Sequence, residues 1–183
     1  MILRKTFRFE ASHVLPKHPG KCSRLHGHSW VLHVETEGER NLETGFVMDY
    51  ADMSAAVKPI IDRLDHRHLG AWCVFLENRE EAKNYSDSAK RMLLAEIWGH
   101  EEGALGEYFK NWQVPGMPLA FNPTSENLLY WIGEQLALSK FKWSKIALEE
   151  TCTSYAELRL DEFMKWYGNT YGMPAVAEAL SGW

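Results

Sequence analysis

Two histidines separated by a single glycine, His26-Gly27-His28, are the feature that most constrains how this chain folds. Side chains two residues apart on a β-strand lie on the same face, so a strand here places both imidazoles side by side. His13 ends an earlier segment in which apolar and polar residues alternate, and it is in phase with the apolar side. The fold must therefore bring two strands together so that three imidazoles converge.

Three converging imidazoles can hold one divalent metal ion. Zinc suits such a set, because three histidine ligands leave a fourth position open, as in catalytic rather than structural zinc sites. A lone His-x-His pair is a weak signal, but a third histidine in phase strengthens it. The sequence therefore predicts His13, His26 and His28 as zinc ligands. His33 has the opposite strand parity and is left out of the set.

A cysteine, Cys22, precedes the paired histidines in a polar loop between Lys21 and Arg24. Two cations and a nearby metal favour the thiolate form of a cysteine outside the ligand set. Such a group can act as an acid or a base near neutral pH. The alternative is a small buried side chain, as free cysteines often are. Cys73 and Cys152 lack this setting and are expected to be packing residues.

Two further polar groups are candidates for chemistry. Asp65 and His66 are adjacent at the end of a predicted helix, where they can form a relay that orients the imidazole. An ordinary polar helix end, where histidine favours the C-terminal dipole, explains them as well. Glu150 shares strand parity with Ile146 and Leu148, and a carboxylate on a buried face needs a donor. A ligand edge with two N–H groups is one such donor, and a strand end that reaches solvent is the alternative.

Residue periodicity gives an α+β order of elements. Strands are predicted at 3–13, 26–37, 45–49 and 143–153, and helices at 49–64 and from about 123 onward. Asp49 is expected to cap the first helix, and Pro59 inside it is expected to kink or limit it. The connections between strands favour antiparallel pairing with the helices on one face.

Length and composition fit one soluble domain. The 183 residues are 45% hydrophobic and 25% charged, and a net charge of −5 without a long basic run argues against nucleic-acid binding. Three cysteines without a Cys-x-x-Cys pair indicate no disulfide framework. No segment approaches the ~20 apolar residues of a membrane span, and no signal-peptide core is evident. We therefore expect one cytoplasmic domain over 1–183.

Taken together, these motifs resemble the family of 6-pyruvoyl tetrahydropterin synthases and 6-carboxy-tetrahydropterin synthases. The three-residue gap between Cys22 and His26 resembles the bacterial carboxy-pterin branch, since the pyruvoyl branch usually has a longer gap. An insertion at about 71–121, longer than the usual ~12–15-residue loop, and a tail at about 158–183 fall outside the resemblance. The matching segments are 7–13, 21–29, 45–49, 64–66, 122–126 and 150–153.

The resemblance implies a tunnelling fold, which is an antiparallel four-stranded sheet with two helices on one face, here with a partly helical insertion. It implies homo-oligomers in which sheets join into a barrel and active sites lie at subunit interfaces. It also implies roles for ten residues: His13, His26 and His28 would bind zinc, Cys22, Asp65 and His66 would be catalytic, and Glu150, Thr124, Ser125 and Glu126 would bind the pterin substrate.

The reaction implied by the resemblance converts 7,8-dihydroneopterin triphosphate to 6-carboxy-5,6,7,8-tetrahydropterin, with release of acetaldehyde and triphosphate, on the path to queuosine. A 6-pyruvoyl-tetrahydropterin synthase, which eliminates triphosphate and keeps the three-carbon side chain, is one alternative. A catalytically dead, zinc-stabilised binding module is another, and the intact catalytic residues argue against it. The expected partners are the pterin triphosphate and further copies of the chain, with neither nucleic acid nor membrane.

Overall fold

The computed structural model describes residues 1–15, 18–70, 116–117 and 121–181, so most of the predicted insertion at 71–121 lies outside the described residues. The chain divides into two compact units. Unit 1 comprises Met1–Phe9, Ser29–Arg63 and Ser125–Trp183, and unit 2 comprises Glu10–His28 and Leu64–Thr124. Strands β1 (Ile2–His13) and β2 (His26–Glu37) contribute residues to both. The assignment of 1–183 to one domain stays a prediction.

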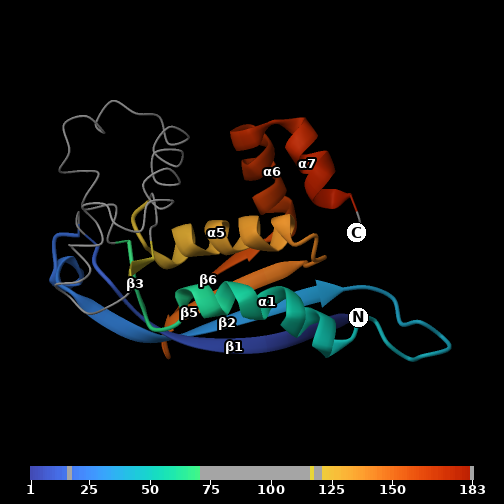
Figure 1. Cartoon of the computed structure of the whole chain (residues 1–183), viewed down its shortest axis with the longest axis horizontal. Helices are drawn as coiled ribbons and strands as arrows, with labels where there is room; N and C mark the ends of the chain where they lie inside the picture. The colour runs from blue at the N-terminus through green and yellow to red at the C-terminus, as the bar shows by residue number, and fades with distance from the viewer. Residues whose placement is uncertain (16–17, 71–115, 118–120, 182–183) are drawn as a thin grey trace, which may run out of the picture. The chain divides into compact units, whose positions relative to one another are not determined.

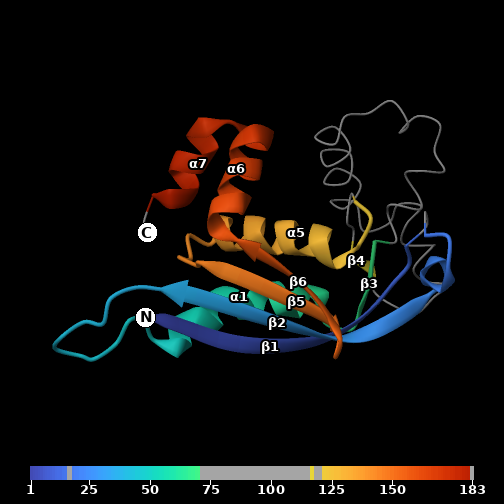
Figure 2. The same ribbon diagram turned by 180° about the vertical axis from the view of Figure 1, so that it is seen from behind.

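Four strands form the sheet of unit 1, in the order β1-β2-β5-β6 (Figure 1). β5 (Lys145–Thr151) pairs antiparallel with β2 on one side and with β6 (Ser154–Arg159) on the other. The registers place Val34, Ile146 and Leu158 in one row, so that apolar residues share a face of the sheet. Figure 2 shows β1 and β2 running in opposite directions. The predicted α+β class with an antiparallel sheet is confirmed.

Two helices, α1 (Tyr50–Leu64) and α5 (Ser125–Leu138), cover one face of this sheet (Figure 1). Asp49 caps α1 as predicted, since its Oδ1 accepts a hydrogen bond from the N–H of Ala51 at 2.7 Å. The core between sheet and helices contains fully buried aliphatic and aromatic side chains from β2, β5, α1 and α5: Trp30, Leu32, Val34, Met53, Val57, Leu128, Ile132, Ile146 and Leu148.

α1 continues past Pro59 to Leu64, the end predicted for it, so of the two expected effects, a kink or an end, the second is wrong. A proline inside a helix leaves the carbonyl four residues earlier without its N–H donor. Here that carbonyl belongs to Ala55, and both Ala55 and Pro59 are exposed, so water can take the place of the missing donor.

The third strand predicted at 45–49 is wrong, because these residues form a loop. Gly45 has a φ of +78°, and the side chain of Asn41 accepts hydrogen bonds from the N–H groups of Glu43 and Thr44. Such an asparagine-centred turn competes with strand pairing. The fourth strand of unit 1 is β6 instead, which the sequence does not reveal because Leu158 is its only fully buried residue.

The predicted tail contains two helices, α6 (Leu160–Tyr171) and α7 (Met173–Leu180). Both lie beside α5 in Figures 1 and 2. Phe163 of α6 is fully buried, and its ring centroid lies 5.4 Å from that of Trp143. The hydroxyl of Tyr171 donates a hydrogen bond to Glu134 of α5 at 2.6 Å. The tail is therefore packed against the other elements of unit 1.

In unit 2 the end of β1 pairs in parallel with β3 (Arg67–Leu69), which pairs in parallel with β4 (Gly116–Met117). Six strands are thus hydrogen-bonded neighbours, where four were predicted. Strands of two or three residues are too short to show an alternating pattern, which is why the sequence does not reveal them. A short 3₁₀ helix, η1 (Lys21–Ser23), precedes β2.

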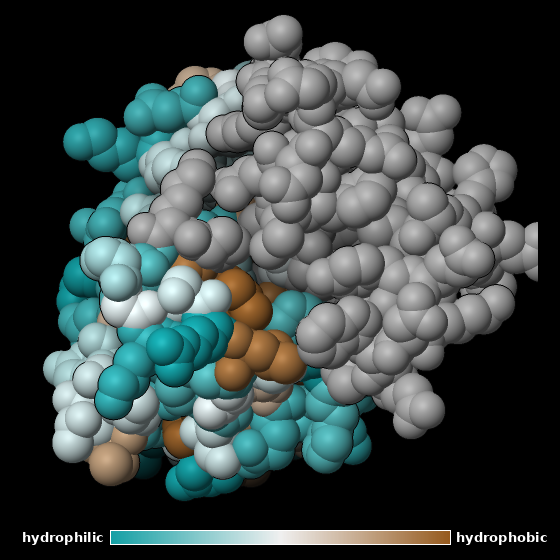
Figure 3. All heavy atoms as spheres, turned by 90° about the vertical axis from the view of Figure 1, so that its left-hand side faces the viewer, coloured by the Kyte–Doolittle hydropathy of each residue, from teal (hydrophilic) through white to brown (hydrophobic). Residues whose placement is uncertain are grey.

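No helix in the described ranges is both long and apolar enough to span a membrane. On the face drawn in Figure 3, hydrophilic residues cover most of the described surface, and the hydrophobic ones gather in a small group.

Candidate metal and catalytic site

The three predicted ligand histidines lie together in unit 2. The ring centroid of His13 is 4.5 Å from that of His26 and 5.1 Å from that of His28, and the last two are 5.0 Å apart. One ring nitrogen of each lies within 4.8 Å of the corresponding nitrogens of the other two. The Nε2 atoms of all three are buried. Two strands thus place three imidazole nitrogens around one point.

Hydrogen bonds to backbone carbonyls fix the orientation of two of these rings. The Nδ1 of His13 donates to the carbonyl of Pro123 at 2.8 Å, and the Nδ1 of His26 donates to that of Arg24 at 2.8 Å. A carbonyl only accepts, so each Nδ1 carries the proton and each neutral ring has its lone pair at Nε2. Among the described residues, the Nε2 of His26 has no hydrogen-bond partner. This is the form in which histidine binds zinc, so the donor set fits that metal.

Two glycines allow the close contacts on which this geometry depends. A Cβ at Gly27 would lie 3.2 Å from the carbonyl oxygen of Ala11, so glycine lets the two strands approach each other between the histidines. Gly70 has a φ of +78°, and a Cβ there would lie only 2.6 Å from Cγ of Pro123. Gly70 therefore makes room for the proline whose carbonyl orients His13. Neither residue was predicted to belong to the site, although Gly70 lies four residues after His66 and Pro123 lies within the matching segment 122–126.

Cys22 lies in the middle of η1, with its side chain partly exposed. The turn is held by hydrogen bonds from the N–H of Leu15 to the carbonyl of Cys22 at 2.9 Å and from the hydroxyl of Ser23 to the carbonyl of Gly20 at 2.8 Å. Cys22 does not belong to the group of side chains that could bind a metal in the described part of the chain. This agrees with a thiol outside the ligand set.

Asp65 and His66 form a hydrogen-bonded pair directly after α1. Oδ2 of Asp65 accepts from Nδ1 of His66 at 2.8 Å, and Oδ1 accepts from the N–H of Glu10 at 2.8 Å. The hydrogen bond from the Glu10 N–H is the main cause that lowers the pKa of Asp65 below its ordinary value, and His66 lowers it further. His66 has a φ of +55°, in the left-handed region in which many helices end. The catalytic role of the pair stays a prediction beside the alternative of a polar helix end.

Another histidine of unit 2, His68, lies on β3 and its Nδ1 is 3.1 Å from the hydroxyl of Ser12. Burial is the main cause that lowers the pKa of His68 below its ordinary value of 6.5. At pH 7 the ring is therefore neutral, and it adds no positive charge beside the three histidines.

The residues expected to bind the pterin lie around the start of α5 and the end of β5. In unit 1, the hydroxyl of Ser125 donates to Oε2 of Glu150 at 3.0 Å, so the structure brings these two together. Glu126 follows in the first turn of α5 and is exposed. Thr124, in unit 2, directly precedes α5, and its N–H donates to the carbonyl of Asn122 at 2.8 Å. The binding roles of all four residues stay predictions.

Comparisons with known proteins agree with the sequence motifs. The model of the family described as 6-pyruvoyl tetrahydropterin synthase matches residues 2–161. A putative 6-carboxy-5,6,7,8-tetrahydropterin synthase of Pyrococcus horikoshii is 30% identical over 164 residues, which cover 84% of this chain and 86% of that protein. The Synechocystis 6-carboxy-5,6,7,8-tetrahydropterin synthase is 45% identical over 73 residues, which cover 37% of this chain and 57% of that protein.

Solved structures show the same fold. A Caenorhabditis elegans 6-pyruvoyl tetrahydropterin synthase superposes with a TM-score of 0.54 at 21% identity, covering 87% of this chain and 94% of that chain. The uncharacterized protein WS1659 of Wolinella succinogenes superposes with a TM-score of 0.59 at 21% identity, covering 87% of this chain and 98% of that chain. The tunnelling fold predicted from the motifs is confirmed.

Proposed function

The chain belongs to the 6-pyruvoyl tetrahydropterin synthase family and is a lyase of pterin biosynthesis, and from this we propose that it is a zinc-dependent 6-carboxy-5,6,7,8-tetrahydropterin synthase. In this proposal 7,8-dihydroneopterin triphosphate is converted to 6-carboxy-5,6,7,8-tetrahydropterin, acetaldehyde and triphosphate, for queuosine biosynthesis. The convergence of His13, His26 and His28, with two rings oriented by carbonyls, is the observation that carries it. Relatives named for the carboxy-pterin product favour this reaction over the pyruvoyl alternative.

The proposed catalytic groups divide the chemistry among them. Zinc held by the three histidines supplies a Lewis acid for the oxygens of the substrate side chain. Cys22, which is not a ligand, takes a proton from a carbon of that side chain as general base. His66 exchanges protons with the reacting groups, and Asp65 holds its ring through the 2.8 Å hydrogen bond to Nδ1. The carboxylate also stabilises the imidazolium when His66 carries two protons.

The pterin ring is anchored at Glu150 in this proposal. Two N–H groups on the amino-pyrimidine edge of a pterin can donate to one carboxylate, as a guanidinium does. Ser125 donates to Oε2 of Glu150, which restricts the rotation of the carboxylate before substrate arrives. Thr124 and Glu126, on either side of Ser125 in the sequence, complete the proposed pterin-binding segment.

We also propose that the protein is a cytoplasmic homo-oligomer with active sites at subunit interfaces. This follows from the family resemblance, and sedimentation of the purified protein tests the assembly.

Product analysis tests the reaction. The zinc-loaded protein is incubated with 7,8-dihydroneopterin triphosphate, the pterin product is identified by mass, and acetaldehyde is trapped as a hydrazone. The 6-carboxy product with stoichiometric acetaldehyde supports the proposal. A product that retains the three-carbon side chain, without acetaldehyde, identifies a 6-pyruvoyl-tetrahydropterin synthase instead. Zinc binding without turnover identifies a binding module.

A further inference from the structure

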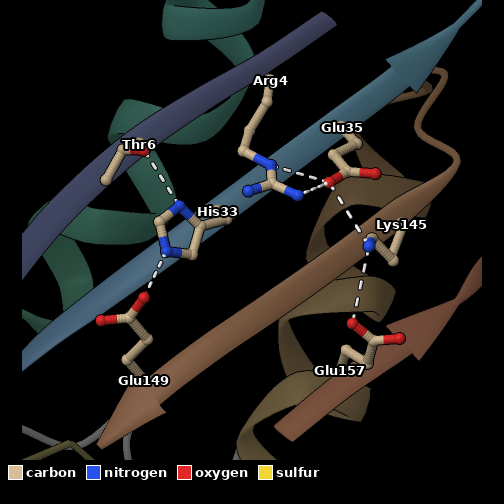
Figure 4. Close-up of polar contacts among 7 residues, drawn as sticks. All are labelled: Arg4, Thr6, His33, Glu35, Lys145, Glu149 and Glu157. Carbon is tan, nitrogen blue, oxygen red and sulfur yellow. Dashed lines mark hydrogen bonds and ion pairs between the residues drawn. The ribbon is translucent and has the colours of Figure 1, made fainter. Parts of the chain in front are cut away.

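Seven side chains form polar contacts across the face of the unit 1 sheet that is turned away from the helices. Figure 4 draws them in front of the strands, with the helical ribbons behind. The contacts fall into two separate groups. The first, which we call the charge row, links the four strands through Arg4, Glu35, Lys145 and Glu157. The second, the histidine tie, links three strands through Thr6, His33 and Glu149.

The histidine tie uses both ring nitrogens of His33. Nε2 donates to Oε1 of Glu149 at 2.7 Å, and Nδ1 is 2.9 Å from the hydroxyl of Thr6. His33 lies opposite Ala147 in the register, so it reaches Glu149 diagonally, as cross-strand neighbours on one face do. The side chain of His33 is 19% exposed and that of Glu149 is 37% exposed. The tie therefore fixes Glu149 relative to both β2 and β1.

Glu149 is the last residue of β5 before an irregularity in its pairing with β6. Glu149 pairs with Tyr155, and Thr151 pairs with Ser154, so β5 carries one residue more than β6 between these pairs. That extra residue is Glu150. A bulge of this kind disrupts the ladder locally and re-aims the side chains around it.

The two consecutive glutamates are held by different partners. His33 holds Glu149 on the face away from the helices, and Ser125 of α5 donates to Glu150. A bulge can slip along a strand by one residue, and a slip exchanges the faces of the side chains involved. A side chain fixed immediately before the bulge opposes such a slip.

We propose that the histidine tie is a positioning element for Glu150. By fixing Glu149, it keeps the bulge at residue 150 and keeps the Glu150 carboxylate directed toward the ligand. This inference rests on the proposed role of Glu150 as the anchor of the pterin ring. Thr6, His33 and Glu149 do not touch substrate in this proposal. They act through the backbone of β5, on substrate affinity rather than on the chemical step.

Replacement of Glu149 by alanine tests the proposal, with Glu157→Ala as the matched control. Both residues are glutamates on the same sheet face, 37% and 44% exposed, and only Glu149 adjoins the bulge. The probe is neopterin, which carries the pterin ring without phosphates, titrated by its fluorescence against zinc-loaded protein. Glu149→Ala is expected to raise the Kd by about threefold to tenfold, the effect of losing one hydrogen bond. Glu157→Ala is expected to change it by less than about twofold, as for an exposed ion pair.

Kinetics and rescue separate positioning from general stability. Glu149→Ala should raise KM and leave kcat nearly unchanged, because the anchor binds ground state and transition state alike. Glu149→Gln should restore most of the affinity, since its amide oxygen still accepts from Nε2 of His33. His33→Ala removes both hydrogen bonds of the tie from the other side, and it provides the same comparison should Glu149→Ala fail to fold.

A double-mutant cycle with Glu150→Ala completes the test. Once Glu150 is removed, Glu149→Ala should cause no further loss of neopterin affinity. Two results would overturn the inference. One is that Glu149→Ala lowers neopterin affinity as much in the Glu150→Ala protein as in the wild type. The other is that Glu150→Ala weakens neopterin binding while Glu149→Ala leaves it unchanged. If Glu150→Ala leaves neopterin binding intact, the pterin anchor of the proposed function fails, and the positioning role fails with it.

Discussion

Replacing Gly70 by alanine should weaken zinc binding, although residue 70 is not a ligand. The added Cβ would lie 2.6 Å from Cγ and 2.8 Å from Cδ of Pro123, well inside van der Waals contact. A proline ring cannot rotate away, so the Pro123 backbone must shift by about 1 Å to restore a normal separation. The Pro123 carbonyl holds Nδ1 of His13 at 2.8 Å, and a shift of this size breaks that hydrogen bond.

The loss of such a partner typically lowers metal affinity by about 10-fold to 100-fold, which is the magnitude expected for Gly70→Ala. Gly45→Ala is the matched control. Gly45 also has a φ of +78°, but a Cβ there meets nothing within 4 Å. Both substitutions therefore lower the free energy of unfolding by about 1–2 kcal/mol, because alanine is strained in a left-handed backbone. Only Gly70→Ala also displaces Pro123.

Competition with a chromophoric chelator measures the zinc affinity of both variants, and thermal unfolding of the metal-free proteins measures the backbone cost. Gly45→Ala should lose stability but retain wild-type zinc affinity. Equal zinc affinities for the two variants would refute the argument that Gly70 and Pro123 orient His13.

Four further predictions concern single residues. His26→Ala should lose nearly all zinc by metal analysis, whereas Cys22→Ala should keep zinc and lose turnover; loss of zinc from Cys22→Ala would show that the thiol is a ligand. The pKa of Asp65 is lowered below 3.8 in the folded protein, so its stabilising contribution is complete above that value and is lost as the pH falls through the folded pKa. Asp65→Asn should therefore reduce the loss of stability seen between neutral and strongly acidic pH in urea titrations, and an unchanged acid profile would contradict this. Leu32→Ala, at a fully buried position, should lower the free energy of unfolding by about 2–5 kcal/mol in the same titrations, and a loss below about 1 kcal/mol would show that the site collapses to fill the cavity.

The long periodic segments of the fold were predictable from sequence. β1, β2 and α1 all have apolar residues at a regular period, and α1 has its Asp49 cap. Elements whose stability depends on distant partners were not predictable from sequence. β6 has a single fully buried residue, and β3 is defined by the pairing of its backbone with the end of β1 and with β4. The loop at 45–49 looks apolar enough for a strand, but the Asn41 side chain stabilises a turn instead.

In the candidate site too, features set by local sequence patterns were predictable, and features set by distant contacts were not. His26 and His28 share a face because they are two residues apart on one strand, and His13 is in phase with the apolar side of its own strand. The parity that excluded His33 from this set also agrees with the structure, where His33 contacts Thr6 and Glu149 instead. The contributions of Gly70 and Pro123 depend on a contact between residues more than fifty positions apart, which no local pattern records. Backbone carbonyls as partners of ring nitrogens are likewise invisible in a sequence, because every residue has one.

The C-terminal helices limit how far the chain can be shortened for expression. The family match ends at residue 161, while Phe163 is fully buried and contacts Trp143, whose own side chain is 1% exposed. A fragment trimmed at the family boundary would uncover this indole and the neighbouring apolar surface of α5. Such a fragment should be prone to aggregation during expression, so the shortest practical gene for this enzyme extends through α7.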